Sequence, residues 1–244
     1  MLPVSSSGHL TLLPALFGWD RGGLDPELAK SYDVALHAGT AAALAIALRD
    51  EVAEVVRSLD SRRLLGVAQT FAPAAIVAGL FEHQIEERLG SARSVALAQV
   101  AAGLALVAAD QAPAVRPHSD ANPLDHLLIG IGQAFALVPG VSRNGATLTA
   151  ARLLRFDRRA ASVLSRHAAL PVIGGAAVLK GARLAQRGLP RELRVPFAAG
   201  AAAAFASTLA SKRLVGVMDR ARSYAPIAAY RIALGGLALR ALPR

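Results

Sequence analysis

The stretch that decides the fold is LLIGIGQAFALVPGVSRNGATLTAARLL, residues 127–154. Its first apolar run, 127–138, has about 12 residues, whereas a helix needs about 20 to cross the hydrocarbon core of a bilayer. The run stops at Pro139-Gly140, and a second apolar segment runs from Ala146 to Leu154. Two short helices joined by a Pro-Gly turn predict a broken helix or a re-entrant hairpin. Irregular backbone at membrane depth is stable only where it lines a polar cavity.

The overall composition also favours a membrane protein. Of the 244 residues, 54% are hydrophobic and 18% are charged, and the mean hydropathy is +0.41. This is more apolar than an ordinary soluble domain. The charged residues gather in short blocks that are separated by stretches with almost no charge, which is the layout of a polytopic membrane protein with short loops. The competing interpretation is an alanine-rich soluble helical bundle, because no single run has the Leu/Ile density of an obvious span.

The expected spans are the segments with almost no charge. Besides the broken segment, they are Val34–Leu48, Leu64–Phe81, Val95–Ala109, Ala160–Leu179, Val195–Ala210 and Ala225–Leu239. No linker is long enough to separate two soluble domains. The expected fold class is therefore all-α, with one polytopic membrane domain over residues 1–244.

The charge and the cysteine count exclude several other classes. The formal net charge is +10, but aromatic residues make up only 5% and no basic stripe follows a polar helix, so nucleic acid is not an expected partner. Loop arginines near lipid headgroups, or an anionic lipid substrate, explain the charge better. The chain has no cysteine, which excludes disulfides and thiolate-bound metals.

A short sequence pattern occurs twice. VSSSG at residues 4–8 and VSRNG at residues 141–145 both have the form V-S-x-x-G, and each follows a proline. Such a short match arises easily by chance. In proteins built from inverted repeats, however, broken helices commonly meet at one site. On this interpretation the repeats cover about residues 1–110 and 123–244, and the opening serines face Arg143 across a shared cavity.

The second copy has the parts of an anion-binding turn. Gly140 and Gly145 permit unusual backbone angles, and the amides at the start of the following helix point toward the turn with the positive end of its dipole. Arg143 supplies a planar cation that matches phosphate oxygens. Three short polar side chains add donors: Ser142, Asn144 and Thr147. The alternative is an ordinary loop with the arginine at the membrane interface.

The first copy supplies hydroxyls and an imidazole. Ser5, Ser6 and Ser7 precede His9, a residue that can carry a proton or attack phosphorus near neutral pH. Alone, a serine-rich terminus is typical of a flexible tail. Together with Arg143, this set of groups suits hydrolysis of a phosphate ester or diphosphate, in which positioning and charge stabilisation dominate.

The two segments together resemble the signatures of the undecaprenyl-diphosphate phosphatase family of the bacitracin-resistance type. The first signature reads approximately E-F-L-P-V-S-S-[ST]-G-H, and residues 2–9 are LPVSSSGH. The second reads P-G-x-S-R-S-G-A-T, and residues 139–147 are PGVSRNGAT, with Asn144 in place of serine. Further pieces agree in the expected order: YDVALHAGTAAALA (32–45), GIGQAFALVPG (130–140) and AAYRIALG (228–235).

This resemblance implies a multi-pass enzyme of the bacterial cytoplasmic membrane that removes the terminal phosphate of undecaprenyl diphosphate. The product is the lipid carrier used for cell-wall polymers, so the protein's partners would be an isoprenoid diphosphate lipid and the membrane. The family fold has two re-entrant helix hairpins related by an inverted repeat, often in a homodimer. The resemblance also implies a divalent cation, Mg²⁺ or Ca²⁺, for which no ligands are assigned.

The same resemblance implies roles for individual residues. The expected catalytic residues are Ser6, His9 and Arg143. The expected substrate-binding residues are Ser5, Ser7, Ser142, Asn144 and Thr147. The nucleophile is left open between Ser6, His9 and a water molecule for which His9 is the base.

Two features depart from the family pattern. Family members carry two glutamates, four residues apart, just before the first signature, whereas this chain begins at Met1 with that signature. We expect a start placed too late; the alternative is a natural short form without catalysis. The glutamates' absence also keeps open a transporter or flippase-like binder of isoprenoid phosphates. The second departure is LSRH at 164–167, where Arg166 and His167 either add a polar contact to the site or mark a loop.

Overall fold

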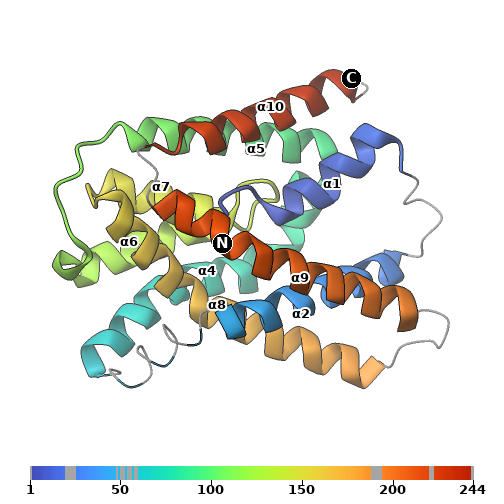
Figure 1. The fold of residues 1–244 in the computed structure, drawn as a ribbon, viewed down its shortest axis with the longest axis horizontal. Helices are drawn as coiled ribbons and strands as arrows, with labels where there is room; N and C mark the ends of the chain where they lie inside the picture. The colour runs from blue at the N-terminus through green and yellow to red at the C-terminus, as the bar shows by residue number, and fades with distance from the viewer. Residues whose placement is uncertain are drawn as a thin grey trace. The chain divides into compact units, whose positions relative to one another are not determined.

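The computed structural model describes residues 2–19, 26–47, 60–187, 194–219 and 223–242, together with residues 49, 53 and 57. Within these ranges the fold is all-helical, as predicted, and contains no β-strand (Figure 1). The helices are α1 (Ser6–Phe17), α2 (Pro26–Ala47), α4 (Ser61–Leu89), α5 (Ala92–Asp110), α6 (Pro123–Phe135), α7 (Arg143–Leu153), α8 (Arg158–Arg187), α9 (Arg194–Asp219) and α10 (Ala225–Ala241), with a short 3₁₀-helix at His118–Asp120.

The helices form two compact units. One unit contains α2, α8 from Leu170 onward and α9 as far as Gly216. Its helices α2 and α9 approach closely at glycine, because a Cβ on Gly39 would meet the backbone of Ala201. The other unit contains α1, α4 to α7, the first part of α8 and α10, and it holds both V-S-x-x-G segments.

The described residues of the expected spans all fall on helices, and Leu48, the last residue of the first span, lies outside the described residues. Two of them, Arg63–Leu89 and Ala92–Asp110, are long and apolar enough to cross a membrane, and Ala35–Ala47 is a shorter apolar helix. On α4, Leu64 and Leu80 are about three-fifths exposed, at 60% and 62%. An apolar helix with exposed leucines fits a lipid-facing position.

The predicted break in the 127–154 segment is confirmed as a helix-turn-helix. Asn122 caps α6 in a reciprocal capping box with Asp125, and α6 ends at Phe135. After a turn, α7 begins at Arg143. The two short helices pack closely, because a Cβ on Gly132 would lie 2.7 Å from the Cβ of Ala150. That this pair re-enters the membrane stays a prediction.

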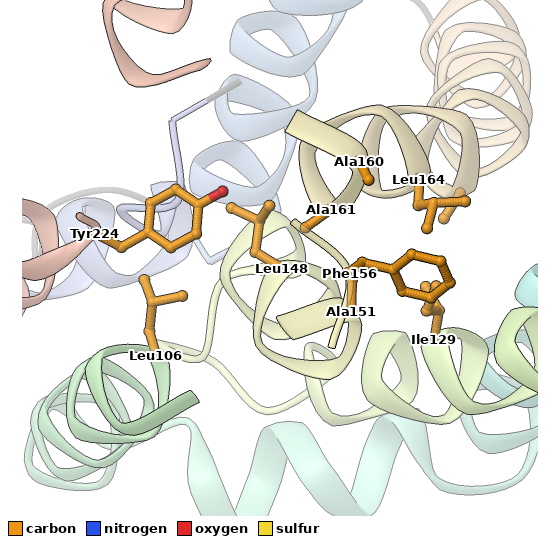
Figure 2. Close-up of a cluster of buried hydrophobic side chains, with 10 residues drawn as sticks. Leu106, Ile129, Leu148, Ala151, Phe156, Ala160, Ala161, Leu164 and Tyr224 are labelled. Atoms are coloured by element: carbon orange, nitrogen blue, oxygen red, sulfur yellow. The ribbon is translucent and has the colours of Figure 1, made fainter. Parts of the chain in front are cut away.

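A buried apolar cluster surrounds α7. Figure 2 shows side chains from α5, α6, α7, α8 and the residue before α10 pointing toward one another. Its members are Leu106, Ile129, Leu148, Ala151, Phe156, Ala160, Ala161, Leu164, Ala168 and Tyr224. Burial of these side chains is the main force that holds α7 among its neighbours.

A buried ion pair fixes the far end of α7. Arg152 is 1% exposed, and its Nε lies 3.3 Å from Oδ1 of Asp110, the last residue of α5. The same carboxylate accepts hydrogen bonds from Arg158 Nε at 2.7 Å and from the Tyr224 amide at 2.9 Å. Asp110 therefore joins α5, α7, α8 and the start of α10.

A second ion pair orders the loop between α5 and α6. Arg116 donates to both carboxylate oxygens of Asp125, at 3.0 and 2.6 Å, and stacks on the ring of Phe156 at 4.2 Å. Burial alone would raise the pKa of Asp125, but the hydrogen bonds from Arg116 and the Asn122 amide lower it below its usual value. The carboxylate is therefore ionised at neutral pH.

Replacing Asp110 tests the importance of the buried ion pair. Asp110→Ala leaves Arg152 buried without its counter-charge, so we expect the free energy of unfolding to fall by about 3–5 kcal/mol. The exposed Asp120 is the matched control, and Asp120→Ala should change stability by no more than about 0.5 kcal/mol. Unfolding of the detergent-solubilised variants, followed by circular dichroism, measures both effects. Equal losses in the two variants would contradict the assignment.

Candidate active site

The two V-S-x-x-G segments adopt the same backbone turn. Ser5 has φ 69° and ψ 100°, and Ser142 has φ 70° and ψ 117°. In each turn the serine Oγ accepts a hydrogen bond from the glycine amide three residues later, Gly8 or Gly145, at 3.2 Å. Positive φ is uncommon outside glycine, and among the described non-glycine residues only Ser5, Ser142 and Arg155 have it. The repeated sequence pattern thus corresponds to a repeated local structure.

Each of these serines caps a helix. Ser5 precedes α1 and Ser142 precedes α7, so both turns present amides at the positive end of a helix dipole. The strained serine backbone is held in place by the cap hydrogen bond. Strain of this kind concentrates at functional sites.

The two turns contact each other. The Gly140 amide donates to Ser7 Oγ at 3.4 Å, and Ser7 Oγ lies 3.2 Å from Ser5 Oγ. Segments 133 positions apart in the chain therefore meet at their polar turns. Ser7 contacts the turn three residues before Arg143. The shared cavity that the sequence predicts stays a prediction.

The ring of His9 is held at both nitrogens. Nδ1 lies 2.7 Å from the Ser5 carbonyl oxygen, which can only accept, so Nδ1 carries a proton. Nε2 lies 2.6 Å from the hydroxyl of Tyr230, and the two rings stack with centroids 5.7 Å apart. In the neutral imidazole, Nε2 is therefore the basic nitrogen and accepts from Tyr230. Ser6 is exposed, and its hydroxyl forms no hydrogen bond within the described residues.

The first turn of α7 is tied to α8. Ser165 Oγ donates to Asn144 Oδ1 and contacts Thr147 Oγ1, both at 2.5 Å. Thr147, which is 1% exposed, also hydrogen-bonds the Arg143 carbonyl at 3.0 Å. This network fixes the direction in which α7 begins. Arg143 itself is half-buried, and no carboxylate in the described ranges pairs with its guanidinium.

The second departure from the family pattern lies inside a helix. Arg166 and His167 follow Ser165 within α8, so the interpretation of this segment as a loop is wrong. Arg166 donates to Ser162 Oγ at 2.8 Å, one turn earlier in the same helix. The helical spacing of Ser162 and Arg166 explains this contact.

Two buried polar side chains that sequence reasoning missed support the turns. Gln99 on α5 donates from Nε2 to the Val4 carbonyl at 2.9 Å. Arg231 on α10 donates from Nη2 to the Val141 and Gly140 carbonyls at 2.7 and 3.0 Å. Val4 and Val141 hold the same position in the two V-S-x-x-G segments, and both supporting side chains are 0% exposed. The available signal was a polar residue in the middle of an apolar run.

The helices that carry these side chains pack at glycines. Helices α5 and α10 lie side by side (Figure 1). Gly103 follows Gln99 by four residues, and Gly235 follows Arg231 by four. A Cβ on Gly235 would lie 2.7 Å from the Ala96 carbonyl, and one on Gly103 would lie 3.3 Å from the Cβ of Arg231. The close approach holds both polar side chains beneath their turns.

Comparison with known proteins identifies the family. The family model described as bacitracin resistance protein BacA matches residues 1–237. The chain belongs to this family. It is 38% identical over 253 aligned residues to an undecaprenyl-diphosphatase of Geobacter sulfurreducens, covering 98% of this chain and 91% of that protein. Undecaprenyl-diphosphatases of Pelobacter propionicus and Moorella thermoacetica are both 37% identical, each over 97% of this chain and 89% and 90% of their own lengths.

Membership of the BacA family confirms the resemblance drawn from the two motifs. Both motifs, at residues 2–9 and 139–147, lie within the matched range. Together with the two apolar helices α4 and α5, the family assignment shows a membrane protein.

The described residues of this BacA-family protein do not fit a divalent cation. Mg²⁺ and Ca²⁺ prefer carboxylate and carbonyl oxygens. The groups around His9 are the hydroxyls of Ser5, Ser7 and Tyr230, and no three His, Asp or Glu side chains gather anywhere in the described ranges. The proposed reaction therefore has no step that is assigned to a metal.

The glycines of the two turns offer a matched test. A Cβ at Gly145 would lie 2.6 Å from Arg231 Nη1, whereas at Gly8 the nearest atoms would be Ser5 Oγ at 3.2 Å and Gln99 Oε1 at 3.3 Å. Overpacking a buried site costs about 1–3 kcal/mol. We expect Gly145→Ala to lose stability in that range and Gly8→Ala to lose less, as measured by unfolding in detergent. A larger loss in Gly8→Ala would contradict the packing described here.

Proposed function

We propose that this protein hydrolyses undecaprenyl diphosphate to undecaprenyl phosphate and inorganic phosphate, which recycles the lipid carrier for cell-wall synthesis. Its BacA family and its undecaprenyl-diphosphatase relatives support this reaction. The observation that carries the proposal is the meeting of two serine-capped turns, one bearing His9 and the other Arg143. Continued supply of the carrier accounts for the bacitracin resistance in the family's name.

The turn before α7 binds the diphosphate in this proposal. Its amides and the positive end of the helix dipole favour an anion. Arg143, at the first helical position, adds a cation that no described carboxylate neutralises. An arginine in an apolar setting needs an anionic partner, and the substrate supplies one. Ser142 and the network through Asn144 and Thr147 hold the turn in shape.

His9 acts on the terminal phosphate. Because Nδ1–H is held by the Ser5 carbonyl, Nε2 carries the lone pair, and it exchanges its hydrogen bond with Tyr230 for the reacting group. In one route Nε2 takes a proton from water or from Ser6 as the new P–O bond forms; in the other, Nε2 attacks phosphorus directly. In each route the bridging P–O bond breaks, and undecaprenyl phosphate leaves. Where Ser6 or Nε2 has taken the phosphoryl group, a water molecule then breaks the bond between that side chain and phosphorus, which releases inorganic phosphate and restores the side chain.

The membrane setting follows the family pattern. We place the protein as a multi-pass enzyme of the bacterial cytoplasmic membrane, with α6 and α7 forming one re-entrant hairpin and α1 belonging to the other. The matched turns, with Gln99 and Arg231 at equivalent positions beneath them, support two related repeats. A homodimer is the proposed assembly.

Removing the Arg143 charge tests the proposed site. We expect Arg143→Ala to lower phosphate release from farnesyl diphosphate by about 100-fold or more, because one such charge stabiliser is typically worth that much. Arg93, exposed at the start of α5, is the matched control, and Arg93→Ala should leave release unchanged. Phosphate is measured colorimetrically with protein in detergent micelles. Arg143→Ala activity within about threefold of wild type would contradict the assignment.

A parallel binding assay distinguishes a phosphatase from a protein that only binds or transports the lipid. Wild-type protein should bind farnesyl diphosphate and release phosphate from it. Binding without any release would overturn the phosphatase proposal in favour of a binder or carrier of the same lipid.

Variants of His9 and Tyr230 test the role of the imidazole. We expect His9→Gln to lower phosphate release by about 100-fold or more, the usual contribution of a general acid–base group. Tyr230→Phe keeps the stacked ring but loses the hydroxyl, and we expect a smaller loss of about tenfold or less because His9 keeps its bond to Ser5. A greater loss in Tyr230→Phe than in His9→Gln would make Tyr230 the reacting group instead.

A further inference from the structure

Arg231 is the most unusual buried group in the unit that holds the site. It lies in the middle of α10 and is 0% exposed. Its Nη2 donates to two carbonyls of the turn before α7, but among the described residues its Nε and Nη1 have no hydrogen-bond partner. Nη1 lies directly against Gly145, only 2.6 Å from where a Cβ would stand. Within the part of the chain that the structure describes, no carboxylate forms an ion pair with it.

Gln99 shows that the supporting role needs no charge. It lies at the equivalent position on α5 and donates to the equivalent carbonyl of Val4, and its Oε1 lies 3.3 Å from where a Cβ on the equivalent glycine, Gly8, would stand. A neutral amide is therefore sufficient to hold such a turn. Burying a guanidinium without a counter-charge is far more costly than burying an amide. The charge of Arg231 therefore needs an explanation beyond support of the turn.

We propose that Arg231 is a positioning residue whose charge makes the α7 turn, and not the α1 turn, the one that recognises the diphosphate. Its guanidinium lies under the first turn of α7 and adds to the positive potential of the helix amides and Arg143 above it. The missing counter-charge is that of the bound ligand. Because Nε and Nη1 are buried, Arg231 acts through the turn without touching the phosphates. This inference rests on the proposed function. It adds that the charge of Arg231 makes the α7 turn selective for the more highly charged diphosphate.

The α1 turn has the complementary role. Its supporting residue is neutral, and the side chains around it are hydroxyls and the imidazole of His9. A neutral turn does not compete for the diphosphate. The difference between Gln99 and Arg231 thus divides binding and chemistry between two turns of the same shape.

The decisive variant is Arg231→Gln, which copies the residue that performs the supporting role on α5. We expect this variant to fold with an unfolding midpoint equal to or above that of the wild type, because an uncompensated buried charge is gone. Its affinity for farnesyl diphosphate should fall by about tenfold or more, the effect of losing one charge interaction at a partly buried site. Its affinity for farnesyl monophosphate should fall less. Arg240→Gln, an exposed arginine in the last turn of α10, should change neither quantity.

Calorimetry and thermal unfolding in detergent micelles measure affinity and midpoint independently of turnover. Arg231→Gln with a lowered midpoint but affinity within about twofold of wild type would overturn the proposal, because it describes a purely structural residue. Arg231→Lys keeps the charge and should bind within about threefold of wild type. If the glutamine variant does not fold, an affinity loss of about tenfold in the lysine variant overturns the proposal instead. Wild-type protein that binds no farnesyl diphosphate would overturn the proposed function, and this inference with it.

Discussion

A helix that begins inside an apolar structure leaves amide groups that water cannot reach, and these amides must be satisfied. The site of this protein depends on how that constraint is met at the starts of α1 and α7. At each start a serine takes a positive φ and accepts a hydrogen bond from a glycine amide. The remaining amides of each turn lie at the positive end of the helix dipole, where an anion is favoured. The glycine three residues after each serine lies beside a supporting side chain, because a Cβ would lie 2.6 Å from Arg231 Nη1 at Gly145 and 3.3 Å from Gln99 Oε1 at Gly8.

The distribution of charge separates structural cations from functional ones. Arg116, Arg152 and Arg158 each pair with a carboxylate, and these pairs fasten the loops and helix ends around α7. At the other end of α7, Arg143 lies in the first helical turn and Arg231 of α10 packs beneath that turn, and in the described residues neither has an anionic partner. One helix is therefore anchored by neutralised charge at its C-terminal end and carries unneutralised positive charge at its N-terminal end. That arrangement suits an anionic ligand such as a diphosphate.

The fold class, the break between α6 and α7 and the positions of the two turns could be predicted from local sequence. The break at Pro139-Gly140 follows from run length, and the all-α fold follows from apolar runs between charge blocks. The two V-S-x-x-G segments specified both the family and the position of the turns, because their serine and glycine act within five residues.

What could not be predicted depends on contacts between distant segments. Tyr230 meets His9 across 221 positions, and Ser165 meets Asn144 across 21. Such pairs cannot be predicted from the sequence, because the pattern of one helix does not show which residues of a distant helix will contact it. Arg231 was visible as an arginine within an apolar run, but its relation to Gln99 became clear only when both were seen to hold equivalent carbonyls. In the sequence, the two residues share one feature, which is a glycine four residues later on the same helix.

The central claim is that the two turns form a single diphosphate site, with binding at α7 and chemistry at His9. An experimental structure of the protein with a non-hydrolysable methylene-bisphosphonate analogue of farnesyl diphosphate tests this claim most directly. The account predicts phosphonate oxygens within hydrogen-bond distance of the α7 amides and Arg143, and the terminal phosphorus facing Nε2 of His9. A bisphosphonate bound elsewhere, with the α7 turn unchanged and His9 still hydrogen-bonded to Tyr230, would contradict it.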